Sequence, residues 1–156
     1  MSRTYRIHAK QILPVTIGQA WDYFSRAENL PFITPASLAL RVTSAPQEGP
    51  VYAGQLIEYT IRPLLGIPLY WMTEITHVEH QRFFADEQRF GPYSFWHHQH
   101  HFREVSDGVE MTDMVHYRIP LGWLGDLANS LFVARQLKEL FSYRSGIIPS
   151  VLKELH

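Results

Sequence analysis

The chain has 156 residues, of which 46% are hydrophobic and 19% charged; its formal net charge is -1 and it has no cysteine. The balanced charge gives no bulk electrostatic reason to expect nucleic-acid binding, and without cysteine there are no disulfides, thiolate metal sites or cysteine nucleophiles. The length is typical of one hydrophobic core, so we expect a single domain over residues 1–156.

The N-terminal part of the sequence predicts one strand and two short helices. Residues 5–13 alternate as a strand with one mostly polar face does. Thr16 is a potential N-cap for a short amphipathic helix whose apolar side includes Trp21. A further short turn of helix is expected over residues 30–33, before Pro35.

The central part predicts strands without long helices between them. A short strand is expected over residues 38–43, and two longer strands over residues 55–62 and 69–78. Between the longer strands, residues 63–68 (PLLGIP) are apolar for a loop. They either fold over a cavity mouth, pack on their own domain, or form an exposed patch that contacts a partner.

Residues 83–120 are expected to form a three-stranded antiparallel meander. Its turn signals are Gly91-Pro92 and Ser106-Asp107-Gly108. Side chains alternate along a strand, so one row of the middle strand holds Trp96, His98, His100 and Phe102, and the other holds Phe95, His97, Gln99 and His101. The first row is the less hydrophilic, and we expect it to form the concave face.

The register of the last two meander strands depends on their turn. If Asp107-Gly108 is a two-residue turn, Ser106 pairs with Val109. This register sets His100 opposite Val115 and His98 opposite Tyr117, with Asp113 on the same face. Asp86, on the first meander strand, would lie opposite His97 or, with a one-residue bulge, opposite His98.

The C-terminal part predicts one long helix that packs on the sheet. Asp126 is a candidate N-cap, and Gly146 and Pro149 predict a kink or break over residues 145–149. The apolar residues fall on one broad stripe: Leu127, Leu131, Ala134, Leu137, Phe141, Ile148, Val151, Leu152 and Leu155. Strands in series with one long helix indicate an α+β fold.

The segments FADEQRFGPYSFWHHQHHF, DGVEMTDMVHYRIPLGWLG and LFSYR resemble the SRPBCC superfamily, also called START-like or birch-pollen-allergen-like, in its polyketide cyclase/dehydrase branch. Within it, the spacing resembles a bacterial subgroup of ligand-binding members whose ligands are unassigned. The resemblance covers essentially the whole chain. It implies a helix-grip fold: a seven-stranded curved antiparallel sheet wrapped around the C-terminal helix, two short helices after the first strand, and an internal cavity.

The expected function is binding of a small hydrophobic ligand, lipid-, polyketide- or aromatic-like, in that cavity. The candidate ligand-binding residues are Trp96, His98, His100, Phe102, Val115, Tyr117 and Phe141. The alternative is a cofactor-independent cyclase or dehydratase, a lyase in which His98 or His100 acts with Asp113 and Tyr117. A third explanation is that these polar residues have a structural role only and hold three strands together by hydrogen bonds.

We expect no cofactor and no metal, although His98 and His100 share a face and could bind zinc with Asp113 or Asp86. Arg144 is expected either to pair on the helix surface or to reach an acidic group of the ligand or sheet. No stretch approaches the roughly 20 apolar residues that span a bilayer, and no signal-peptide pattern opens the sequence, so we expect a cytoplasmic protein. The sequence does not indicate an oligomeric state.

Overall fold

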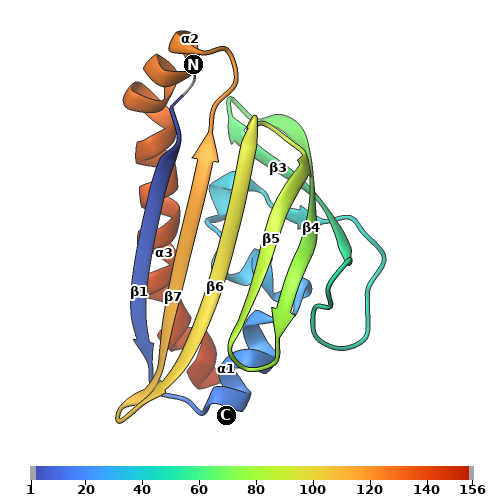
Figure 1. Ribbon diagram of the computed structural model, residues 1–156, viewed down its shortest axis with the longest axis vertical. Helices are drawn as coiled ribbons and strands as arrows, with labels where there is room; N and C mark the ends of the chain where they lie inside the picture. The colour runs from blue at the N-terminus through green and yellow to red at the C-terminus, as the bar shows by residue number, and fades with distance from the viewer. Residues whose placement is uncertain (1–2, 155–156) are drawn as a thin grey trace.

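A computed structural model describes residues 3–154 of the chain, which form an α+β fold dominated by one antiparallel sheet (Figure 1). The sheet has seven strands in the order β1-β7-β6-β5-β4-β3-β2. The strands are β1 (Tyr5–Leu13), β2 (Arg41–Val42), β3 (Leu56–Leu64), β4 (Ile67–Glu79), β5 (Phe83–Phe90), β6 (Phe95–Val105) and β7 (Gly108–Arg118). The predicted seven-stranded sheet is confirmed.

The short helices follow β1. They are α1 (Ile17–Phe24) and two 3-10 segments, η1 (Ala27–Ile33) and η2 (Ala36–Leu38). Thr16 caps α1 as expected: its side chain accepts from the Gln19 amide, while the Gln19 side chain accepts from the Thr16 amide. This reciprocal pair satisfies two backbone donors that the first helical turn leaves open.

A continuous helical run forms the second layer. It consists of α2 (Trp123–Ala128), a π-helical turn η3 (Asn129–Val133) and α3 (Ala134–Glu154). The sheet curves around α3, and α1 and the 3-10 segments cover the rest of the same face (Figure 1). The predicted helix-grip arrangement is confirmed.

Two apolar clusters fill the space between the layers. One lies against α1 and the C-terminal half of α3 and includes Trp21, Phe84 and Phe102. The other lies against the N-terminal half of α3 and includes Trp96 and Leu137. Phe102 and Trp96 stand at opposite ends of one row on β6, so the two residues between them, His98 and His100, separate the clusters.

The start and phase of the C-terminal helix differ from the prediction. Helix begins at Trp123, after Gly122 with a φ of 56°, so Asp126 lies inside the first turns and is not the N-cap. Leu131 is 73% exposed, whereas Leu137 and Phe141 are buried as expected. The π-helical turn explains the difference, because its i→i+5 bonding changes the phase of the side chains before it relative to those after it. The predicted burial of Leu131 is wrong.

Other details of the helix and loops can be compared in the same way. Helix continues through Pro149 to Glu154, so the expected break is absent there; Leu155 lies outside the described residues. The PLLGIP segment forms the ends of β3 and β4 and their turn, where Leu65 is 87% exposed. Within residues 3–154, no helix is long and apolar enough to cross a membrane.

The meander register also differs from the prediction. Val105 pairs with Gly108, so the turn is Ser106-Asp107, one residue earlier than expected. A Cβ on Gly108 would overlap the carbonyl oxygen of Leu13, so this glycine serves the close approach of β1. His98 therefore lies opposite Val115, and His100 lies opposite Asp113. The slip of two residues on β7 keeps the predicted face, because side chains alternate with a period of two.

The helix packing predicts different costs for the same substitution at two positions. Leu137→Asp should prevent folding, because burying this leucine contributes about 1.5 to 3 kcal/mol and the new carboxylate would be buried without a partner. Leu131→Asp should leave the urea midpoint within a few tenths of a molar of wild type, since its side chain is exposed. Circular dichroism during urea titration measures both. If Leu131→Asp were unfolded and Leu137→Asp folded, the buried face of the helix would be misassigned.

Candidate functional site

A cavity of about 420 Å³ lies between the concave face of the sheet and α3. This volume is within the range of small-molecule sites in proteins, roughly 300 to 1,000 Å³. Most of its walls are apolar or aromatic: β3 contributes Ile57, Tyr59 and Ile61, β4 contributes Trp71, and α3 contributes Leu140 and Phe141. The wall thus combines hydrophobic area with aromatic surface.

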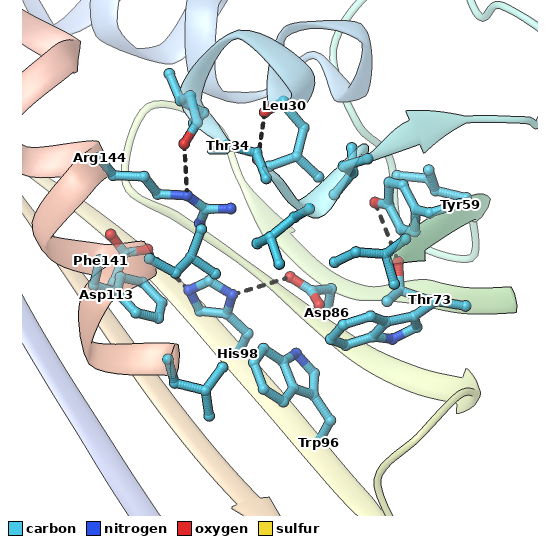
Figure 2. Close-up of a pocket in the computed structure, with 18 of the residues that line it drawn as sticks. Leu30, Thr34, Tyr59, Thr73, Asp86, Trp96, His98, Asp113, Phe141 and Arg144 are labelled. Carbon is cyan, nitrogen blue, oxygen red and sulfur yellow. Dashed lines mark hydrogen bonds and ion pairs between the residues drawn. The ribbon is translucent and has the colours of Figure 1, made fainter. Parts of the chain in front are cut away.

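One part of the wall is strongly polar. Asp86 from β5, His98 and His100 from β6, and Asp113 from β7 all line the cavity. The strand register brings them together, because Asp86 lies directly opposite His98 and His100 directly opposite Asp113. The two imidazole centroids are 3.8 Å apart. We call these four residues the His-Asp cluster; Figure 2 labels three of them, Asp86, His98 and Asp113.

Both ring nitrogens of His100 contact carboxylates. Its Nε2 lies 3.1 Å from Asp86 Oδ2, and its Nδ1 lies 2.9 Å from Asp113 Oδ1. A neutral imidazole would turn one lone pair toward a carboxylate oxygen, so this geometry favours the imidazolium, which donates at both nitrogens. Burial alone would lower the pKa of His100, but the hydrogen bonds to Asp113 and Asp86 outweigh it and raise the pKa to about 9.

His98 has different surroundings from His100. Its Nε2 lies 2.9 Å from Asp113 Oδ1, and its Nδ1 lies 3.9 Å from Asp86 Oδ2. Burial and the adjacent charge of His100 lower the pKa of His98, so a neutral ring that donates from Nε2 to Asp113 fits its surroundings. Although burial would raise the pKa of Asp113, the hydrogen bonds from His100 and His98 hold it well below its usual range.

Arg144 also faces the cavity, projecting from α3 toward the His-Asp cluster (Figure 2). Its Nε donates to the Ile33 carbonyl at 3.2 Å, and its guanidinium carbon lies 5.4 Å from the Phe141 ring centroid. Burial lowers the pKa of Arg144, while Asp113 and Asp86 act in the opposite direction. Pairing on the helix surface, one of the two predicted roles, is therefore wrong.

The predicted ligand-binding residues fall into two groups. Trp96, His98, His100 and Phe141 line the cavity, as does Asp113 from the catalytic alternative. Phe102, Val115 and Tyr117 share the concave face but pack into the core clusters and are not among the lining residues.

The three core residues have specific partners or positions. Phe102 lies with its ring 5.7 Å from that of Trp21, and Val115 is fully buried. Tyr117 stacks on Tyr5 at 5.4 Å, and its hydroxyl donates to Asn129 Oδ1 at 2.9 Å. The register explains the change on β7, because it places Asp113 beside His100 in the position that Val115 was expected to hold.

The wall formed by β3 and β4 was not predicted from the sequence. Tyr59 and Trp71 lie directly opposite each other there, and Thr73 donates toward the Tyr59 hydroxyl at 3.5 Å. The alternation of Ile57, Tyr59 and Ile61 along β3 was the available signal. It predicts a shared face but not which face borders a cavity.

The same cluster contains the potential metal ligands. Asp86, His98 and His100 offer ligand atoms that all lie within 4.8 Å of one another. Metal binding requires deprotonated ligand atoms, and the carboxylates on both sides of His100 favour its protonated form. The hydrogen bonds already satisfy these side chains, and we propose no metal for them.

The protonation of His100 predicts how stability depends on pH. A pKa that is raised on folding, from about 6.5 to about 9, gives stability that is complete below about pH 6.5 and is lost as pH rises through about 9. Wild type should therefore lose on the order of 3 kcal/mol of unfolding free energy across this window. Urea titrations at several pH values measure the loss.

Two variants on β6 make this test specific. His100→Gln should be less stable at neutral pH but should lack most of the alkaline loss. His97→Gln, on the opposite face of the same strand, should keep it, because His97 contacts Glu87 and not the cluster. An equal alkaline loss in wild type and His100→Gln would show that His100 is not a buried imidazolium.

Comparisons with known proteins identify the fold. No family model matches the chain, and no curated protein matches it. Among solved structures, TTHA0849 from Thermus thermophilus is 12% identical, with a TM-score of 0.76 over 97% of this chain and 99% of that one.

Two further similar structures have names that indicate a function or a class. A norcoclaurine synthase point mutant from Thalictrum, in complex with a transition-state analogue, is 13% identical, with a TM-score of 0.68 over 99% of this chain and 97% of that one. Ara h 8.0201 is 11% identical, with a TM-score of 0.62 over 95% of this chain and 99% of that one. The chain therefore shares one fold with these proteins, which is the birch-pollen-allergen-like fold.

Proposed function

We propose that residues 1–156 act as one domain that binds a small hydrophobic ligand in the cavity between the sheet and α3. The observation that carries the proposal is the cavity itself, about 420 Å³ of space with mainly apolar and aromatic walls. Burial of apolar ligand surface against such walls is favourable by roughly 25 cal/mol per Å² before the costs of association. The fold supports this proposal, because norcoclaurine synthase, which shares it, has been solved in complex with a transition-state analogue and with dopamine and hydroxybenzaldehyde.

The ligand-contacting residues that we propose come from both sides of the cavity. Trp96 and Phe141 provide aromatic surface near the His-Asp cluster, and Tyr59 and Trp71 extend it along β3 and β4, where the Trp71 ring lies 5.1 Å from that of Trp96. His98 and His100 would orient a polar part of the ligand. Phe102, Val115 and Tyr117 would act indirectly, by supporting the strands that carry these residues.

Filling the cavity should weaken ligand binding. Leu140→Trp replaces a side chain that lines the cavity with a larger aromatic one. It should weaken binding of the neutral fluorescent probe N-phenylnaphthylamine by roughly tenfold or more. Leu131→Trp adds the same ring on the exposed side of the helical run and should leave the affinity unchanged. Fluorescence titration measures both dissociation constants, and thermal melting verifies folding. Tight probe binding by a folded Leu140→Trp protein would place the binding site elsewhere.

A second candidate function is cofactor-independent enolisation of a ketone, as in a cyclase or dehydratase. The specific observation is the contrast within the His-Asp cluster: His98 has a lowered pKa, so its unprotonated Nδ1 could accept a proton, beside the imidazolium of His100. Tyr117 is not part of this candidate site, because its hydroxyl is bound to Asn129 and it does not line the cavity. His100, whose two ring N–H groups already donate to Asp86 and Asp113, would contribute only its positive charge near the developing oxyanion.

This second function predicts measurable proton exchange. The wild-type protein should accelerate exchange of the methyl protons of acetonaphthone with deuterium oxide, and His98→Gln should reduce the acceleration by on the order of 100-fold. Proton NMR follows the exchange, with His97→Gln as the control on the outer face. If wild-type protein binds the ketone tightly but exchange proceeds at the rate measured in buffer alone, the enolisation function is rejected and the binding function stands.

A further inference from the structure

The guanidinium of Arg144 is only partly satisfied by the protein. Its Nε donates to Ile33, and its plane lies near the Phe141 ring. Among residues 3–154, its two terminal amino groups have no hydrogen-bond partner within 3.5 Å. They belong to a side chain that lines the cavity, so they are directed at whatever the cavity holds.

The nearby carboxylates do not take the place of a partner. Asp86 and Asp113 influence Arg144 electrostatically, but in the described part of the chain neither approaches it within the 4.0 Å of an ion pair. Their oxygens already accept from His100 and His98. An arginine taken out of water without a close partner is costly, so an acceptor that enters the cavity gains from meeting these amino groups.

We propose that the ligand carries a carboxylate, which the two terminal amino groups of Arg144 bind in a fork while the apolar remainder lies between the aromatic walls. The inference rests on the proposed binding function and adds the chemical class of the ligand. The planar guanidinium matches a carboxylate with two parallel hydrogen bonds, and such charge-assisted bonds are about twice as strong as neutral ones.

The charges beside Arg144 favour one negative charge on the ligand over two. Asp86 and Asp113 lie beside two cationic groups, His100 and Arg144, and the other cationic residue of the cavity wall, Arg26, is paired with Asp22. A monoanion bound at Arg144 adds one charge at a position where two amino groups compensate it. A phosphate monoester would bring close to two charges beside two carboxylates, and we expect it to be disfavoured.

The test compares ligands that differ only in their polar group. Naphthoate, methyl naphthoate and naphthyl phosphate compete with the neutral probe N-phenylnaphthylamine for wild-type protein and three variants. Wild type should bind naphthoate at least about tenfold more tightly than the methyl ester or the phosphate. Arg144→Gln should lose this preference when each affinity is expressed relative to the variant's own affinity for the neutral probe. Arg144→Lys should keep part of it, because the charge remains and the fork is lost.

Arg135→Gln provides the matched control. Arg135 lies on the same helix, exposed and paired with Glu139, so this variant should keep the full preference of wild type. Equal wild-type affinity for naphthoate and its ester would overturn the inference and leave the proposed function standing, and this comparison needs no variant. A preference for naphthoate that persists in Arg144→Gln would overturn it too. Failure of wild type to bind even the neutral probe would instead reject the proposed function.

Discussion

The contacts of His100 with Asp86 and Asp113 are the constraint on which the rest of the site depends. On the concave face of the sheet, the His100 ring lies within 3.1 Å of a carboxylate oxygen of Asp86 and of one of Asp113, so that three charged groups are in direct contact. Such charges are tolerated away from water only when each has its partners, and removal of one leaves another uncompensated. The pairing also links β5, β6 and β7 through side chains, so the strand register and the electrostatics of the site specify each other.

The position of this cluster explains why the interior is divided. On β6, Trp96 belongs to one apolar cluster and Phe102 to the other, with the two imidazoles between them. Apolar side chains from α3 cannot close over charged groups without cost, and the space beside the imidazoles is where the cavity lies. Arg144 enters this space from α3 and complements the charge of the sheet. The cavity wall is thus polar beside the two imidazoles and mainly apolar or aromatic elsewhere. This pattern is the one expected for a ligand with one polar and one apolar part.

The sequence predicted the elements and the face better than it predicted exact partners. Alternation along β6 identified Trp96, His98 and His100 as one row, because the period of a strand is a property of local geometry. The pairing of β6 with β7 was misplaced by two residues, because Gly108 lies after the turn as the first residue of β7, where its φ of 133° and its close approach to Leu13 both favour glycine. That contact joins residues far apart in the sequence, and a local turn signal contains no information about it.

The helical errors have a similar origin. A regular period placed Leu131 on the stripe of Leu137, but the π-helical turn between Asn129 and Val133 changes the phase, and composition alone does not reveal it. The sequence left two possible roles for Arg144, and the position of α3 relative to the His-Asp cluster decides between them. Tertiary placement, more than residue type, decides which polar side chains reach the cavity.

A crystal structure of the protein with bound N-phenylnaphthylamine tests the central claim most directly, because an apolar probe could bind either in the cavity or on the exposed surface. The account predicts density for the aromatic rings inside the cavity, between Trp71 and Phe141, with the contacts of the His-Asp cluster preserved. The competing location is the outer surface, where the apolar side chains of Leu65, Leu121 and Trp123 are 87%, 78% and 73% exposed. Density for the probe on that surface, with no probe between the sheet and α3, would contradict the account.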